Sequence, residues 1–130
     1  AYHATMPTDA LRQFRDTMLE TEEYGFDKVR DEQWALGNGV RGLMAQHQFR
    51  SVAAEGFEAP GVAVYYTDDP EIQNGSKFAK VGLQIAAGVP LQCNEGDNFT
   101  TFRLGLFGLD KLHNVERSVE SLDQALKTVL

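Results

Sequence analysis

The stretch Val62-Ala63-Val64-Tyr65-Tyr66 is the clearest strand signal in the chain, because it is short, apolar and rich in β-branched and aromatic side chains. Gly61 precedes it and Asp68-Asp69-Pro70 follows it, so turn-forming residues bound it on both sides. The pattern predicts a buried strand over residues 62–66.

A helix is expected directly after this strand. Asp68 or Asp69 can cap its first turn, and Pro70 suits its first position. We expect this helix to kink or restart at Asn74-Gly75 and to end at Gly88. Asp68-Asp69 could also be read as a metal or acid–base pair, but the proline that follows favours the capping role.

Two further strands and a helix are predicted towards the C-terminus. Val89-Pro90-Leu91 begins a short strand, which Pro90 restricts to an edge or to the strand start. Residues 101–105 form another apolar run that ends at glycine. Asn114 can cap a last helix, whose apolar residues recur at helical spacing: Val115, Val119, Leu122, Leu126 and Val129.

Towards the N-terminus, residues 49–52 can form a short edge strand, and two helices precede them. Residues 27–47 have a helical pattern that contains Gly37, Gly39 and Gly42, which indicates either close packing or a break. Residues 8–24 carry an apolar stripe, with Thr8 as a plausible N-cap and Gly25 as the residue that ends the helix. The expected fold class is α+β: a small, mainly antiparallel sheet with helices packed on one face, preceded by two helices.

Composition excludes several classes of function. The 130 residues carry a net charge of −7, which argues against a nucleic-acid or anionic-membrane surface. A run of eighteen apolar residues and a secretory signal are both lacking, and the single Cys93 fits a reducing compartment, so we expect a cytoplasmic location. The chain begins at Ala1 rather than Met, and we expect it to be a segment of a longer protein.

Most catalytic and metal-binding patterns are missing. The sequence has no nucleophile elbow, zinc motif or phosphate loop, and its three histidines are far apart (His3, His47 and His113). Its five lysines lie in polar surroundings that give no reason for a lowered pKa (Lys28, Lys77, Lys80, Lys111 and Lys127). We expect no metal site and no catalytic residue in this segment.

Arg103 is the most informative polar residue, because it lies within the otherwise apolar run of residues 102–108. A buried guanidinium needs an anion, and its planar fork can hold a carboxylate through two parallel hydrogen bonds. Gly105 nearby would leave room for a ligand. The alternative is an arginine that pairs with a surface Asp or Glu of this chain.

Phe102-Arg103-Leu104-Gly105 resembles the late strand of class V, fold type I pyridoxal-phosphate aminotransferases, in particular the alanine–glyoxylate and serine–pyruvate group. The arginine of that family's R-[IL]-G motif binds the substrate α-carboxylate. Tyr2-His3-Ala4-Thr5-Met6-Pro7 is similar to the family's Y-x-x-T-x-P segment, whose Tyr and Thr reach the cofactor phosphate of the neighbouring subunit. The resemblance covers essentially the whole chain, with these two motifs near its ends.

The resemblance implies that Arg103 binds substrate and that Tyr2 and Thr5 contact pyridoxal 5′-phosphate across a dimer. Residues 1–48 would be a helical segment leading from a large upstream domain, and residues 49–130 the small C-terminal domain. The family's cofactor lysine belongs to that upstream domain. The parent enzyme would therefore transfer an amino group between a small amino acid and a 2-oxo acid, while this segment alone would be inactive and hold no cofactor.

Two other functions remain open from the residues. One is a stand-alone, self-associating interaction module without enzymatic activity, and the other is a small-anion-binding domain that uses Arg103 by itself. In either the enzyme or the module, we expect a homodimer or higher oligomer, because the apolar stripe of the first helix needs a partner.

Overall fold

The computed structural model describes residues 4–96 and 98–130, and within them it has an α+β fold of six helices and a three-stranded antiparallel sheet. The helices are α1 (Thr8–Tyr24), α2 (Phe26–Gln46), α3 (Pro70–Gln73), α4 (Ser76–Lys80), α5 (Leu109–Leu112) and α6 (Val115–Val129). The strands are β1 (Val62–Tyr66), β2 (Ala86–Ala87) and β3 (Thr101–Gly105). The predicted fold class is therefore confirmed.

The sheet has the order β1-β3-β2, so β3 is central and both neighbours run antiparallel to it. Tyr65 pairs with Phe102, and Ala63 pairs with Leu104. Side chains alternate between the two faces of a sheet, so these four buried residues all point to the same side. The edge strand expected over residues 49–52 is reduced to a single bridge between Ser51 and Tyr65.

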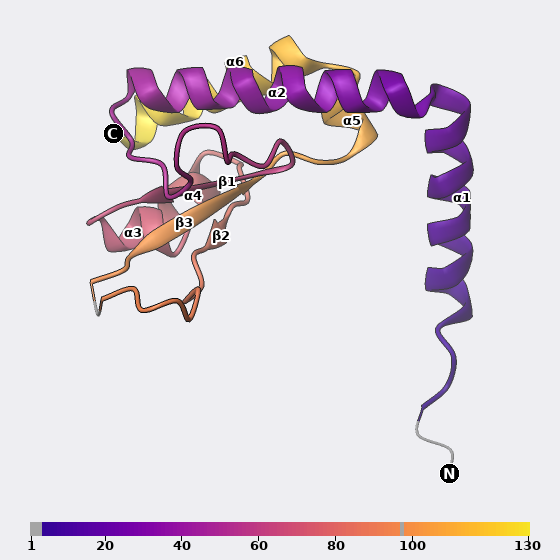
Figure 1. Ribbon diagram of the computed structural model, residues 1–130, viewed down its shortest axis with the longest axis horizontal. Helices are drawn as coiled ribbons and strands as arrows, with labels where there is room; N and C mark the ends of the chain where they lie inside the picture. The colour runs from indigo at the N-terminus through magenta and orange to yellow at the C-terminus, as the bar shows by residue number, and fades with distance from the viewer. Residues whose placement is uncertain (1–3, 97) are drawn as a thin grey trace.

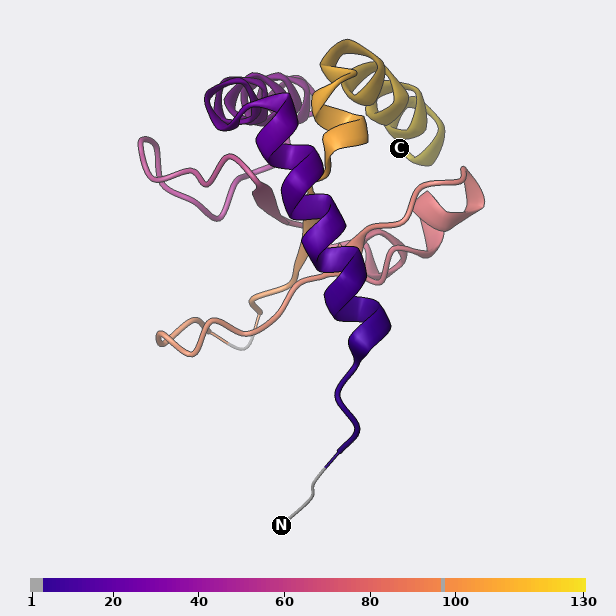
Figure 2. The ribbon, with the colours of Figure 1, turned by 90° about the vertical axis from the view of Figure 1, so that its right-hand side faces the viewer.

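The helices α2 and α6 cover this apolar side of the sheet (Figure 1). The core that they form with the sheet includes Leu36, Met44, Phe102 and Leu126, each of which is at most 1% exposed. Burial of one such side chain stabilises a fold by about 1.5–3 kcal/mol. The opposite side of β3, which carries Arg103, has no long helix packed on it (Figures 1 and 2).

The three glycines of α2 do not break the helix, which is continuous from Phe26 to Gln46. A Cβ atom on Gly37 would lie 2.9 Å from the Pro60 carbonyl oxygen, and one on Gly39 would lie 3.0 Å from Val119. Gly42 has open space beside it. Close packing therefore explains the glycines at positions 37 and 39, but not Gly42.

Helix α1 has the predicted bounds but stands apart from the core, projecting at a steep angle from the start of α2 (Figure 1). None of its residues, Thr8 to Tyr24, is buried. Gly25, at φ 102°, ends α1 as predicted, since only glycine adopts this conformation without strain. Thr8 is wrong as the N-cap: it is the first helical residue, Pro7 takes the cap position, and no side chain caps the helix.

The helix predicted from Pro70 to Gly88 is shorter than expected. Asp69 caps it as expected, and it restarts after Asn74-Gly75, but α4 ends at Lys80. Gly82 adopts φ 81°, and the Leu83 amide donates to the Phe78 carbonyl, which closes the helix. The chain is then extended, so that β2 forms where helix was predicted.

Residues 89–91 do not form the predicted strand. Pairing with β3 involves Ala86 and Ala87 instead, and it ends at Gly88, whose amide donates to the Thr101 carbonyl. Pro90 has no amide hydrogen to continue the ladder. The last helix has the predicted bounds, although the Asn114 side chain donates to the Asp110 carbonyl rather than capping it, and the short helix α5 before it was not predicted.

Candidate functional site

Arg103 lies at the middle of the sheet, on the face away from the core. In the register of β3, its two neighbours are Val64 on β1 and Ala86 on β2. Phe102 and Leu104, directly before and after it, point into the core. Strand alternation thus places the half-buried Arg103 side chain on the opposite, open face.

One backbone contact orients the Arg103 side chain. Its Nε donates a 2.8 Å hydrogen bond to the Ala87 carbonyl oxygen across the β2–β3 pair. Among residues 4–96 and 98–130, no carboxylate lies within ion-pairing distance of Arg103. Neither of the two terminal nitrogens of the guanidinium, which together form the carboxylate-binding fork, has a hydrogen bond or ion pair with another described residue.

Two glycines near Arg103, Gly88 and Gly105, have little space beside them for a side chain. A Cβ atom on Gly88 would lie 1.8 Å from the Thr101 Oγ1 atom, so only glycine permits β2 to approach β3 here. The Gly88 requirement was not recognised from the sequence. The space beside Gly105 is not open as expected, because the Phe107 ring lies 3.2 Å from where its Cβ would be.

A second arginine belongs to the same open face. The Tyr66 amide donates to the Arg50 carbonyl, and the Arg50 guanidinium stacks 3.9 Å above the centre of the Tyr66 ring. Phe99 also packs edge-on against the Tyr66 ring, and the two ring centroids are 5.5 Å apart. Arg50 was not singled out from the sequence, although the expected edge strand over 49–52 would have placed it on a sheet face.

The described part of the N-terminal motif, residues 4–7, precedes α1 and is separated by that helix from the sheet. Tyr2 is outside the described residues. Thr5 is exposed and precedes α1, at the end of that helix remote from α2 and the sheet (Figure 1). The structure of a single chain therefore does not bring Thr5 and Arg103 together.

Each of the five lysines contacts another residue of the chain. Lys28 lies 4.1 Å from the Tyr24 ring centre, and its hydrogen bond with Tyr24 raises its pKa. Lys111 donates to the Phe107 carbonyl, and Lys127 pairs with Asp123.

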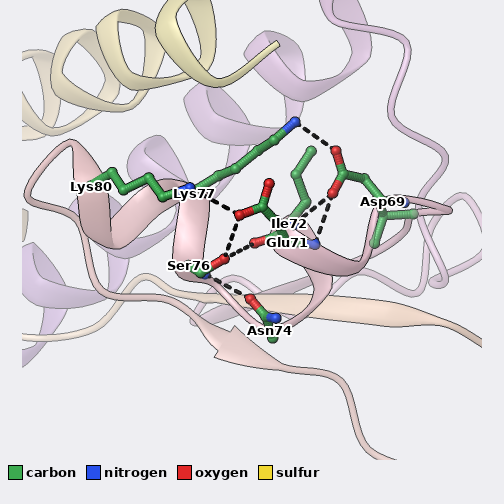
Figure 3. A network of polar contacts seen from close by, with 8 residues as sticks. Asp69, Glu71, Ile72, Asn74, Ser76, Lys77 and Lys80 are labelled. Atoms are coloured by element: carbon green, nitrogen blue, oxygen red, sulfur yellow. Dashed lines mark hydrogen bonds and ion pairs between the residues drawn. The ribbon is translucent and has the colours of Figure 1, made fainter.

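The remaining two lysines belong to a polar network that joins α3 and α4 (Figure 3). Lys77 Nζ lies 2.6 Å from Asp69 Oδ2, and Lys80 Nζ lies 2.9 Å from Glu71 Oε1. The ammonium groups lower the pKa of both carboxyl groups, and Asp69 also accepts hydrogen bonds from the Glu71 and Ile72 amides. The network fixes a helix turn, which confirms the capping role of Asp69.

Cys93 does not have the environment of a reactive thiol. The Glu95 carboxylate accepts hydrogen bonds from the Gln92 and Cys93 amides, and these bonds lower the pKa of Glu95 to about 2. The same carboxylate raises the pKa of the exposed Cys93 thiol. A raised pKa reduces the thiolate fraction and hence the nucleophilicity.

Three polar side chains with buried atoms (Arg41, Ser51 and Tyr65) were also not singled out from the sequence. Arg41 donates through Nη2 to the Ala59 and Val62 carbonyls, but its Nη1 is buried without a hydrogen-bond partner in the described part of the chain. The hydroxyl groups of Ser51 and Tyr65 are likewise buried without a hydrogen-bond partner among the described residues. Tyr65 as a whole is 2% exposed. Burial raises the pKa of Tyr65, while the nearby Arg41 acts in the opposite direction.

No metal centre or membrane span is present in the described residues. No three His, Cys, Asp or Glu side chains come together there as metal ligands would. The histidines instead make local contacts: His47 lies 3.4 Å from Asp123, and His113 stacks on Tyr24. None of the helices is both long and apolar enough to cross a bilayer.

No family model matches the chain, and no curated protein is significantly similar to it. The assignment of function therefore depends on the residues of this chain and on the motifs described above.

Proposed function

We propose that the chain is the C-terminal small domain of a class V pyridoxal-phosphate aminotransferase, and that Arg103 binds the α-carboxylate of its amino-acid substrate. The observation that carries the proposal is the Arg103 guanidinium, which lies on the open face of the sheet with its Nε fixed and no carboxylate partner among the described residues.

The geometry suits a carboxylate. The Ala87 carbonyl holds Nε, which leaves the terminal nitrogens to donate two parallel hydrogen bonds to the two oxygens of a carboxylate. Bidentate contact fixes the orientation of the bound amino acid as well as its position, so that its Cα–H bond can be presented to a base elsewhere in the enzyme. The apolar neighbour Val64 lowers the local polarity, which strengthens such a contact.

The cofactor itself is not held by the lysines of this chain. Each lysine already contacts a group of its own chain, and none matches the position of the family's cofactor lysine. In the parent enzyme, a lysine of the large domain would bind the cofactor, which supplies an electron sink for the reaction. The contribution of this chain would be the carboxylate anchor, together with Tyr2 and Thr5 at a subunit interface.

Helix α1 supports the existence of a large partner. Its apolar stripe is exposed over its whole length (Leu11, Phe14, Met18 and Leu19, continued by Phe26 of α2). An isolated helix of this length is marginally stable in water, so packing against another surface is needed to hold it. A large domain of the same enzyme, or a second subunit, would supply that surface.

The same stripe favours a second candidate function, a self-associating interaction module without activity. The gene distinguishes the two: an open reading frame extending about 250 residues upstream would support the enzyme, from the usual size of such multi-domain chains. A stop codon directly upstream would favour the module.

The carboxylate role can be tested on the 130-residue chain. We expect alanine, pyruvate and glyoxylate to shift the NMR resonance of the Arg103 Nε–H group, and Arg103→Lys to abolish their binding. Arg50→Lys is the matched control, since Arg50 lies on the same face but stacks on Tyr66. Equal shifts with inorganic chloride and phosphate would instead indicate a general anion site.

A further inference from the structure

A cleft of about 290 Å³ lies on the helix-covered side of the sheet, behind the strand that carries Arg103. Its walls come from α2, the end of β3, α6, and residues 83–85, which lead into β2. Five aliphatic side chains, each less than 9% exposed, make its floor: Leu36, Val40, Leu104, Leu106 and Leu122. The packed core of the protein therefore has an opening at this point.

The rim of the cleft is polar and carries an excess of positive charge. Arg117 Nη2 lies 2.8 Å from Asp110 Oδ2, while Lys111 Nζ donates only to the Phe107 carbonyl. Two cations and one carboxylate give the rim a net charge of +1, whereas the whole chain has −7. Ser121 adds a hydroxyl group at the same edge. An apolar floor with a cationic rim fits a molecule with a hydrocarbon body and one anionic group.

We propose that this cleft binds a small monocarboxylate with an apolar body. Its volume of about 290 Å³ is roughly twice that of an engineered apolar cavity of about 150 Å³ that holds benzene, which indicates a ligand of about six to twelve non-hydrogen atoms. The hydrocarbon part contacts the aliphatic floor, and the carboxylate meets Lys111 and Arg117 at the rim. The site is distinct from Arg103, whose side chain is on the other face of β3.

The occupied cleft would also act on Arg103 through the backbone. Leu104, adjacent to Arg103, forms part of the floor, and Ile85, which leads into Ala86 and Ala87, lines the opposite wall. The Arg103 Nε hydrogen bond to Ala87 spans these same two segments. A ligand that contacts both segments is expected to change the environment of that hydrogen bond, so a shift of the Arg103 Nε–H resonance reports a carboxylate at Arg103 itself only if it persists in the variant Ser121→Phe, in which the cleft is filled.

The probe for the test is 3-phenylpropionate, titrated into the 130-residue chain and followed through the methyl resonances of the floor residues. A ligand of this size is expected to bind with Kd between about 0.01 and 1 mM. The alcohol 3-phenylpropan-1-ol, which lacks the charge, and acetate, which lacks the hydrocarbon body, should each bind at least about 5-fold more weakly.

Two variants and a control locate the binding site. Ser121→Phe, at an exposed position of α6, fills the cleft without changing the core and should abolish binding. Arg117→Gln should weaken binding by about 5-fold or more while the alcohol is unaffected. Arg30→Gln removes an arginine of similar exposure that pairs with Asp27 and Asp31 far from the cleft, and it should change nothing.

Saturable shifts of the floor methyls, lost in Ser121→Phe, would support the site. The proposal is wrong if no saturation occurs up to about 20 mM, if the shifts fall on the α1 stripe instead, or if Ser121→Phe binds as the parent chain does. The outcome does not depend on the role proposed for Arg103, because neither the probe nor the variants involve its side chain.

Discussion

Arg103 Nε donates a 2.8 Å hydrogen bond to the Ala87 carbonyl oxygen, which fixes a guanidinium on the open face of the sheet without using its terminal nitrogens. The contact is possible because Gly88 lets β2 lie close to Thr101 on β3. A backbone oxygen, rather than a carboxylate, thus orients this arginine. In the proposed function, its positive charge binds the carboxylate of a ligand.

In the proposed full-length aminotransferase, Arg103→Lys should mainly damage substrate binding. Lysine keeps the charge but loses the two-pronged geometry, and the expected loss of transition-state stabilisation is about 2–4 kcal/mol. The measurement is kcat/KM for the wild-type and variant enzymes. A value within about 3-fold of wild type, less than about 1 kcal/mol, would contradict the anchor role.

Pyridoxal phosphate added to the 130-residue chain should give no stable imine absorption band that depends on one particular lysine. The reason is that each lysine already contacts a group of its own chain, as in the 2.6 Å contact between Lys77 and Asp69. Absorbance spectra of the parent chain and of five single Lys→Ala variants provide the check. Loss of a band in one variant alone would overturn the expectation.

The 130-residue chain should associate into a homodimer or higher oligomer through α1. Phe14 is 64% exposed and Met18 54%, and an apolar patch of several hundred Å² usually finds a partner. Light scattering should show a mass above that of a monomer, and Phe14→Glu with Met18→Glu should shift it to the monomer. Gln13→Glu, on the same helix but outside the stripe, is the control; a monomeric parent chain at about millimolar concentration would count against the prediction.

The network between α3 and α4 should make stability depend on pH in the acid range. The pKa of Asp69 lies below its ordinary value of 3.8, chiefly because Lys77 donates to it. A carboxyl group with a lowered pKa in the folded state contributes stability above its unfolded pKa, and this contribution is lost as the pH falls through the folded pKa.

The corresponding measurement is the melting temperature of the wild type and of Lys77→Met. Lys77→Met should lower it at about pH 7, and the difference should shrink towards zero as the pH falls through the lowered pKa of Asp69 and the carboxyl group becomes protonated. Arg12→Met is the control, because the Arg12–Asp9 pair is highly exposed and contributes little. A difference that stays constant across this range would assign the effect to packing of the lysine stem instead.

Gly37→Ala and Gly42→Ala should have opposite effects on stability. A Cβ on Gly37 would meet the backbone oxygen of Pro60 at 2.9 Å, so alanine there should destabilise the fold by about 1–3 kcal/mol despite its better helix propensity. Gly42 has open space, so alanine there should stabilise the fold by up to about 1 kcal/mol. Urea unfolding of the two variants measures both, and equal effects would show that helix propensity alone governs this helix.

Local patterns were sufficient to predict the bounds of α1, α2, β1, β3 and α6. Each of these elements has an apolar period or a compact apolar run of its own, and Gly25 ends α1 by a preference that needs no neighbour. The position of Arg103 within an apolar strand was predictable to the same extent. An arginine within an apolar strand is conspicuous in any sequence, whatever the strand packs against.

Other features required the tertiary structure. β2 forms at Ala86–Ala87 rather than at residues 89–91 because it is selected by pairing with β3, and Gly88 is required only because Thr101 is its neighbour. Gly37 is likewise required because the backbone of Pro60, which is distant along the chain, lies directly against it.

Local residue patterns account for α1, α2, β1, β3 and α6 and for the presence of an unusual arginine, since these follow from residues within a few positions of one another. The tertiary structure decided that Arg103 faces away from the helices, that Ala87 orients it and that a cleft lies behind it. Those properties depend on which strands pair and which face α2 and α6 cover, and the energies that decide them come from contacts between distant segments.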